Sequence, residues 1–263
     1  MGSASTQALA ATTKALDAAS GVDLETAREL FAAARIVGDS PQLSGALADP
    51  AAAPAARTRV VSDVFGPTFG RTTVSILTTA VGQRWSNAGQ LIDGIEELAV
   101  RAAAISAPGV DVEGELFRVS RTIAENPELE LALGSRLGDE SAKGSLIETL
   151  LRGRASAATT LIVSSLVQQP RERRVRELVS HAMDLVAGQR DSIVATVITA
   201  RPLSAAQTER LSAVLTRRYG KRVGLNSVID PSVVGGLRVQ IADDVIDASV
   251  AARLTELRER LAG

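Results

Sequence analysis

The carboxyl-terminal part of the fold is decided by the stretch Asp230-Pro231-Ser232-Val233-Val234-Gly235-Gly236-Leu237-Arg238-Val239. Pro231 fixes its own φ angle and lacks an N–H, which suits a turn. Gly235 and Gly236 supply backbone freedom where a strand must bend or a neighbouring chain segment must come close. Leu237 and Val239 then alternate with polar residues, which is the period-2 pattern of a half-buried strand. The stretch therefore predicts a turn, a bend and a strand.

The residues on either side of this stretch complete a small domain. Residues 193–199 read as a strand buried on both faces. Ser204 and Gln207 have the spacing of a capping box, and the helix that they begin ends at Gly220, a suitable C′ glycine. Further predicted elements are strands at 221–230 and 245–247 and an amphipathic helix at 250–262, with Ser249 as its cap. We expect an α/β domain over residues 190–263.

The composition of the whole chain favours helices and excludes several functions. Hydrophobic residues make up 45% of the 263 residues, but aromatic residues only 2%, and much of the apolar content is alanine. The net charge of −1 argues against non-specific nucleic-acid binding, which needs a basic surface. The absence of cysteine excludes disulfides and thiolate metal sites. No cofactor is predicted.

The sequence shows no segment suited to enter a membrane. Residues 1–11 lack the basic and apolar regions of a signal peptide. The longest weakly polar stretch, residues 155–167, is too short to span a bilayer. We expect no direct membrane insertion; if the protein works at a membrane, another chain must hold it there.

An internal repeat organises the first two thirds of the chain. Glu29-Leu30-Phe31 recurs 86 residues later as Glu115-Leu116-Phe117. Ser40-Pro41 recurs as Asn126-Pro127, so both repeats are expected to start a short helix with the same cap followed by proline at the first position. The other matched pairs fall on apolar faces and helix starts: Leu43/Leu129, Leu47/Leu133, Arg57/Lys143, Val61/Ile147, Val64/Leu150, Thr73/Thr159, Ile76/Ile162 and Val81/Val167. Alanine-rich low complexity does not place proline and phenylalanine in register, so the repeat predicts a duplicated fold.

The repeat and the carboxyl-terminal pattern together predict the architecture. The fold is expected to be mainly α, with two tandem bundles of the six-helix type followed by the small α/β domain. The expected boundaries are 1–105 for the first bundle, 106–189 for the second and 190–263 for the third domain. The helix at 88–105 closes the first bundle and either opens or adjoins the second.

The carboxyl-terminal third resembles the delta subunit of the F-type ATP synthase, a member of the oligomycin-sensitivity-conferring protein family. The resemblance is carried by Val194–Leu215, Tyr219-Gly220-Lys221-Arg222-Val223, Ile229–Gly236, Asp244–Val250 and Arg253-Leu254. The second repeat is similar to the family's six-helix domain, and the duplicated form is similar to the long delta subunits of high-GC Gram-positive bacteria. Ala242 and Ala248 stand where the family usually has glycine, so we expect a different turn type there.

The resemblance implies a non-catalytic stator subunit, present in a single copy in a hetero-oligomer. The helical part is then expected to bind the amino-terminal segments of the alpha subunits at the catalytic head, with beta subunits as further candidate contacts. The α/β domain is expected to bind the b subunit of the peripheral stalk, a separate chain. The implied location is the cytoplasmic face of the cell membrane, held by the complex. The alternative is a helical adaptor or regulatory scaffold with a partner-binding α/β tail.

The sequence offers no catalytic constellation. His181, the only histidine, lies in a predicted helix among apolar residues, and no second histidine or cysteine is available for a metal site or a catalytic triad. Gly235-Gly236 precedes a strand rather than opening a helix, so it fails the context test for a phosphate loop.

The candidate partner-binding residues come from three regions. Trp85 lies at a predicted inter-helix turn and is either a core residue or an interface residue. The basic run with Arg171 and Arg174 is either a solvated turn or a contact for an acidic partner. The final helix either packs on the sheet or accepts a partner helix. The full predicted set is Trp85, Arg171, Arg174, Gly235, Gly236, Leu254 and Leu257.

Overall fold

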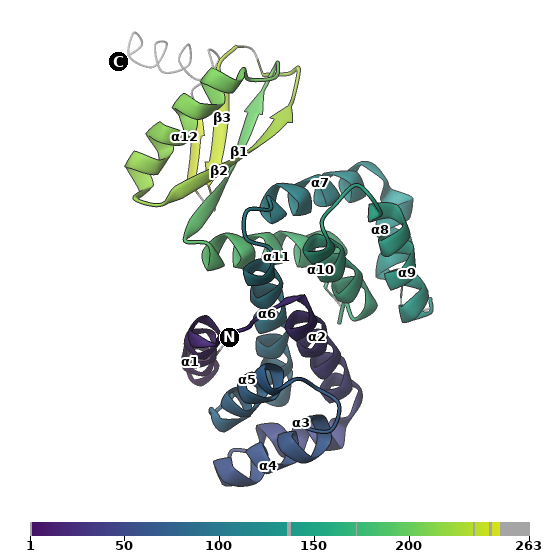
Figure 1. Ribbon diagram of the computed structural model, residues 1–263. Helices are drawn as coiled ribbons and strands as arrows, with labels where there is room; N and C mark the ends of the chain where they lie inside the picture. Colours follow the sequence, from purple (N-terminus) through teal and green to yellow (C-terminus); the bar gives the residue numbers. More distant parts are fainter. Residues whose placement is uncertain (1, 136–137, 172, 234, 242–243, 248–263) are drawn as a thin grey trace, which may run out of the picture. The chain divides into compact units, whose positions relative to one another are not determined.

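The computed structural model describes residues 2–135, 138–171, 173–233, 235–241 and 244–247 (Figure 1). Within these residues the fold is mainly helical, with a four-stranded sheet near the carboxyl terminus, as predicted. The chain divides into two compact units, Met1–Val186 and Ala187–Gly263. Each unit has a hydrophobic core of its own.

All regular elements among the described residues of the first unit are helices. Their bounds are α1 (Ser3–Ala18), α2 (Leu24–Asp39), α3 (Pro41–Ala48), α4 (Pro54–Phe65), α5 (Arg71–Gly82), α6 (Ala88–Ser106), α7 (Val112–Glu125), α8 (Pro127–Gly134), α9 (Glu140–Leu151), α10 (Ala157–Gln168) and α11 (Val175–Gln189), whose last residues belong to the second unit.

The predicted repeat is confirmed by these bounds. Helices α3, α4 and α5 recur as α8, α9 and α10, and both ends of each helix are displaced by 86 residues. Helix α2 corresponds to α7, because their last residues are 86 positions apart and a single residue separates each from a proline-initiated helix. The counterpart of α1 falls at residues 89–104, which lie inside α6. Helix α6 therefore ends the first bundle and begins the second.

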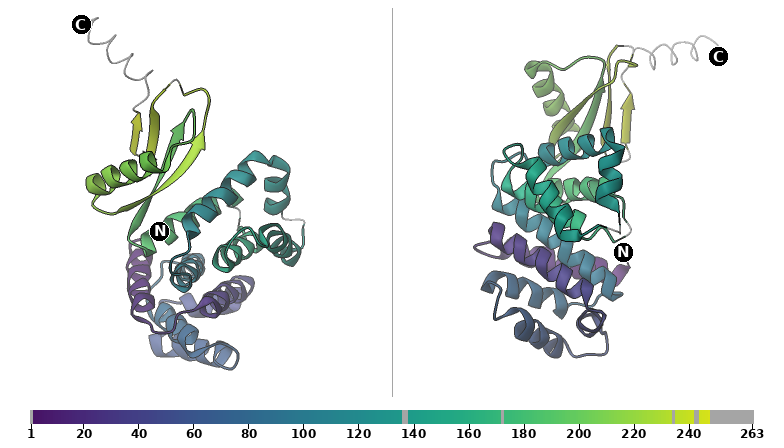
Figure 2. Two further views of the ribbon diagram at one scale, coloured as in Figure 1. Left: turned by 45° about the horizontal axis from the view of Figure 1, so that its top comes forward. Right: turned by 90° about the vertical axis from the view of Figure 1, so that its right-hand side faces the viewer.

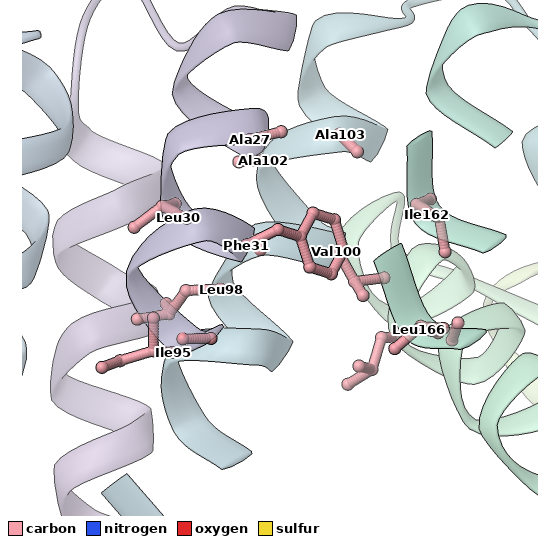
Figure 3. Packing of buried hydrophobic residues seen from close by; sticks show 14 of the residues in the cluster. Ala27, Leu30, Phe31, Ile95, Leu98, Val100, Ala102, Ala103, Ile162 and Leu166 are labelled. Carbon is pink, nitrogen blue, oxygen red and sulfur yellow. The ribbon is translucent and has the colours of Figure 1, made fainter. Parts of the chain in front are cut away.

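The burial of α6 fits this double role. Twelve of its 19 residues are buried, including Leu91, Ile95 and Leu98, so apolar side chains cover almost its whole circumference. It contacts α1, α2, α3 and α5 of the first bundle and α10 of the second. Figure 3 shows Phe31 of α2 beside Val100 of α6 in the same core as Ile162 of α10. The two bundles thus share one continuous core.

A repeated glutamate contact fixes the fifth helix of each bundle. Glu29 of α2 accepts hydrogen bonds from the backbone N–H of Gly70, at 2.9 Å, and from the hydroxyl of Thr73. In the second bundle Glu115 accepts from the N–H of Ser156, at 2.9 Å, and from the hydroxyl of Thr159, at 2.5 Å. These groups lie at helix amino termini, where free N–H groups and the helix dipole favour an anion. The duplication therefore preserves a long-range contact as well as the order of helices.

The proline-initiated helices differ between the repeats. Both begin with proline at the first position, as predicted. Ser40 caps α3, because its hydroxyl accepts from the N–H of Leu43 at 3.2 Å. Asn126 makes no such cap, and its amide instead donates back to the carbonyl of Thr122 at 2.7 Å. The prediction that both repeats use the same cap is therefore wrong for Asn126.

The second unit contains a mixed sheet and one described helix. Its elements are β1 (Ser192–Thr199), α12 (Ala205–Tyr219), β2 (Arg222–Ile229), β3 (Leu237–Ile241) and β4 (Asp244–Asp247). The strand order is β2-β1-β3-β4. Strand β1 pairs parallel with β2 and antiparallel with β3, and β3 pairs antiparallel with β4. Helix α12, which connects the parallel strands, lies along one face of the sheet (Figure 2).

The local signals of the second unit act as predicted. Ser204 and Gln207 form the capping box of α12, and Gly220 ends that helix with φ of 71°. Gly235 and Gly236, just before β3, have φ angles of 68° and 77°. These positive φ angles belong to the left-handed backbone conformation, which glycine adopts more easily than other residues. The core is small, with Ala195, Val197, Leu215, Val223, Val239 and Ile241 fully buried.

One expectation for this unit is not met, and others cannot be compared with the described residues. The faces of β1 are covered unequally: Ala195 and Val197 are buried, whereas Val194 and Ile198 are half-buried. Burial on both faces was therefore overestimated from the continuous apolar run. The expectations for Ala242, Ala248 and the helix at 250–262 lie outside the described residues.

Candidate partner-binding surfaces

The described residues form several surface depressions and expose single apolar side chains. Among them no group of three or more His, Cys, Asp or Glu side chains is arranged to hold a metal ion. Within the same residues, every helix is too short or too polar to cross a membrane.

Trp85 is a core residue of the first bundle. Its side chain is 2% exposed, and its indole N–H donates to the carbonyl of Ala80 at 2.8 Å. The ring lies against Gly94 of α6, where an added Cβ would be 2.2 Å from Cη2 of the indole. Only glycine leaves room for the ring at this position. Of the two interpretations of Trp85, this placement favours the core.

Arg171 is tied to α6. Its Nη2 lies 2.8 Å from Oε2 of Glu96 and 3.0 Å from Oδ1 of Asp93, while Nη2 of Arg173 lies 2.8 Å from Oε1 of Glu96. Glu96 is only 8% exposed, so losing both arginines would leave a carboxylate poorly solvated. The solvated-turn interpretation is therefore wrong for Arg171 and Arg173. The sequence could not show this pairing, since 75 residues separate Arg171 from Glu96.

Arg174 lies in a different environment. It is exposed and lines a depression of about 530 Å³ beside Leu131, whose side chain is 78% exposed. Arg176 lines the same depression and pairs with Glu130 at 3.0 Å. A cation beside an exposed leucine is a surface that suits a partner with both apolar and acidic groups.

His181 pairs with a second carboxylate of α6. Its Nε2 lies 3.5 Å from Oε1 of Glu97, and the hydrogen bond to Glu97 raises the pKa of His181 above 6.5, against the opposing effect of burial. Asp184, one turn further along α11, has its pKa raised by burial. Because this histidine has a structural partner and belongs to no group of three possible metal ligands among the described residues, it fits the structural interpretation.

An apolar groove between α7 and α9 is the feature that the sequence analysis missed. This α7/α9 groove has a volume of about 560 Å³. Its floor is formed by Val119, Ile123, Leu129, Ile147, Leu151 and Ala155, and its rim by Arg118, Thr122, Asn126, Glu128, Leu146, Leu150 and Arg154. The 86-residue repeat could have indicated this groove. Leu151 and Ala155 stand where the first bundle has the larger side chains of Phe65 and Phe69, so less space is filled in the second bundle.

The second unit exposes apolar side chains on its helix and on both edge strands. Val214 of α12 is 59% exposed, Ile229 at the end of β2 is 53% exposed, and Val245 of β4 is 54% exposed. Gly235 and Gly236 lie at the exposed turn that leads into β3. Strands β2 and β4 are the outer strands of the described sheet. Leu254 and Leu257 lie outside the described residues.

The fold and these surfaces define a class: a duplicated helical-bundle protein with a small mixed-sheet domain and several surfaces suited to protein partners. The family model described as ATP synthase delta (OSCP) subunit matches residues 99–261. The chain therefore belongs to the ATP synthase delta (OSCP) subunit family, and by that family it is a non-catalytic subunit of ATP synthase. The matched range covers the carboxyl-terminal part of α6, the second bundle and nearly all of the carboxyl-terminal unit.

Curated relatives match over the whole chain, including the first bundle. The "ATP synthase subunit delta" of Leifsonia xyli is 48% identical, with all of both chains covered. That of Streptomyces avermitilis is 40% identical, with 98% of each chain covered. A chain in a cryo-EM structure of the Toxoplasma gondii mitochondrial ATP synthase hexamer overlaps with a TM-score of 0.39 and 22% identity, covering 64% of this chain and 96% of that one.

Proposed function

We propose that this protein is a stator subunit that links the catalytic head of an F-type ATP synthase to its peripheral stalk. The observation that carries the proposal is the full-length match to relatives named as delta subunits of this enzyme. In this role the helical bundles (residues 1–105 and 106–189) bind amino-terminal segments of the alpha subunits, and residues 190–263 bind the b subunit. The complex holds a single copy at the cytoplasmic face of the cell membrane.

The mechanism is mechanical rather than chemical. A stator must hold the head still while the rotor turns, so that proton flow is coupled to ATP synthesis. Such a link needs slow dissociation from its partners and a body that transmits load. The core shared through α6 supports the second requirement, because close-packed interiors have low compressibility.

The exposed apolar groups support a division of labour between the units. On the helical unit, Arg174 and Leu131 offer a mixed basic and apolar contact. On the α/β unit, Gly235, Gly236 and the exposed Ile229 and Val245 offer contacts at the sheet. We assign the first region to the head and the second to the stalk.

The test measures binding of two partners to the same protein. The full chain is expected to bind a synthetic peptide of the alpha-subunit amino terminus and, independently, the soluble part of the b subunit. Removing residues 190–263, which begins after α11 ends, should abolish binding of b but leave the peptide affinity unchanged. Failure of the full chain to bind any alpha-subunit peptide at high micromolar concentration would refute the stator role.

A further inference from the structure

The two bundles differ most clearly at the end of their fourth helix. In the first bundle Phe65 and Phe69 stack, with ring centroids 5.1 Å apart, and Phe65 is 1% exposed. At the corresponding positions of the second bundle, Leu151 and Ala155 replace two aromatic rings with smaller side chains and line the α7/α9 groove. Comparison of the two repeats thus shows that the second bundle lacks the two aromatic side chains that fill this place in the first bundle.

The shape of the groove favours a helix over a small molecule. Its lining on α7 runs from Glu115 to Ile123, which corresponds to about 12 Å or two helical turns, and continues to Asn126 at the end of that helix. Leu146 and Leu150, one turn apart on α9, are 41% and 40% exposed along its rim. A small-molecule site also needs polar groups that converge on the ligand. The carboxylate of Glu115 is already bonded to Ser156 and Thr159.

The charged side chains at the rim of the groove indicate which charges a bound helix would carry. Arg118 and Arg154 are exposed at the end where Glu115 meets α10, and no carboxylate of the described chain forms a salt bridge with either arginine. The positive charge of Arg118 acts on Glu115 and favours its ionised form. Glu128, in the first turn of α8, lies at the other end. Acidic side chains and the negative carboxyl end of a helix are therefore favoured near the two arginines.

We propose that the α7/α9 groove is a docking site for an amphipathic α-helix of a partner chain, with leucine-sized side chains facing the groove and acidic residues facing Arg118 and Arg154. The apolar side chains take the space that Phe65 and Phe69 occupy in the first bundle. The proposal rests on the groove alone and does not require the stator role.

The probes are two designed peptides of about 18 residues that share a leucine stripe at i, i+4, i+7 and i+11. One carries glutamates on its remaining faces and the other lysines. Fluorescence anisotropy with the full-length protein should show that the acidic peptide binds at least about tenfold more tightly than the basic one. Because neither sequence comes from an ATP synthase, the result is separate from the test of the stator role.

Substitutions in the groove locate the binding site. Ala155→Phe, which inserts the ring found at Phe69, should weaken binding of the acidic peptide by about tenfold, and Arg154→Glu should reverse the preference between the peptides. Leu150→Lys should also weaken binding. The matched control is Val64→Lys, the same change at the corresponding, similarly exposed position of the first bundle, and it should leave the affinity unchanged.

Several results would overturn the proposal. These are equal binding of both peptides, no binding of the acidic peptide up to about 0.5 mM, or an affinity that neither Ala155→Phe nor Leu150→Lys changes. A dimer in sedimentation experiments that Leu150→Lys abolishes would assign the groove to a second copy of this chain. Leu150→Lys alters an exposed side chain, so it keeps the test valid if Ala155→Phe fails to fold.

Discussion

The two helical bundles show how one frame can be completed in two ways. Both use a glutamate of the second helix, Glu29 or Glu115, to hold the amino terminus of the fifth helix. The bundles differ at the end of the fourth helix and on the sixth helix. The first bundle ends its fourth helix with stacked phenylalanines, whereas the second leaves a groove. The sixth helices differ as well, because Ile95 of α6 is fully buried and its counterpart is His181, half exposed on α11.

The comparison suggests that, after the duplication, one bundle can contribute mainly to stability and the other mainly to binding of partners. Contacts needed for the frame are kept in both bundles, because a helix end without partners is costly in either. Positions that only add packing can change in one bundle while the other maintains the shared core. The first bundle is therefore expected to contribute more stability, and the second more binding surface.

The largest expected effect breaks the aromatic cluster of the first bundle. Phe65→Ala removes a side chain that is 1% exposed and should lower the free energy of unfolding by about 3–5 kcal/mol. Leu151→Ala, at the corresponding half-buried position, should cost less, because solvent already reaches the site. Urea unfolding followed by circular dichroism measures both changes. A larger loss for Leu151→Ala would reverse the proposed roles of the bundles.

A smaller and more symmetric effect is expected for the repeated glutamates. Glu29→Ala and Glu115→Ala each remove the acceptor for a helix amino terminus and should each cost about 1–3 kcal/mol. Because the bonded groups correspond at 70/156 and 73/159, the two losses should agree within about 1 kcal/mol. Thermal melts compare the pair. Strongly unequal losses would show that the two contacts are alike in geometry but not in energy.

The pH dependence of Glu115 sharpens this prediction. Burial opposes ionisation of Glu115, but hydrogen bonds from Thr159 and Ser156 outweigh it and lower its pKa below 4.5. A carboxyl with a lowered folded pKa stabilises the fold above its unfolded pKa, and this stability is lost as the pH falls through the folded value. Glu115→Gln should therefore flatten the acid end of the stability curve below about pH 4.5.

The smallest effect concerns His181, whose counterpart in the first bundle is apolar. Its pKa is raised above 6.5, so its pair with Glu97 stabilises the fold fully below pH 6.5 and loses this effect as the pH rises through the folded pKa. The effect should stay below about 1 kcal/mol, since the histidine is half exposed. His181→Gln should remove this slope above pH 6.5, as measured by melting temperature against pH.

Asp184 provides the check on this assignment. Burial raises its pKa above 3.8, so its ionisation destabilises the fold as the pH rises from 3.8 towards the folded value. Ionisation of Asp184, like deprotonation of His181, lowers the stability as the pH rises, but it begins at a lower pH. Asp184→Asn should therefore leave the decrease in melting temperature above pH 6.5 in place. A slope above pH 6.5 that survives His181→Gln would assign the titration to another group.

The elements and their repetition could be predicted from local signals in the chain. Ser204 with Gln207, Gly220 and Pro127 act within a few residues of the chain, so each signal can be recognised without knowing the fold. The 86-residue period survives for a related reason: each copy needs the same apolar faces to close its bundle. The family resemblance rests on such local signals in the carboxyl-terminal third.

Contacts between side chains that are remote in the sequence could not be predicted and became visible only in the folded protein. Only the fold could show that Arg171 reaches Glu96 across 75 positions, or that Trp85 fills the space left by Gly94. The α7/α9 groove belongs to the same class, because a cavity is set by side chains that converge from several helices. Local propensities specify where a helix begins and ends, but charge pairing and packed volume are properties of the assembled core.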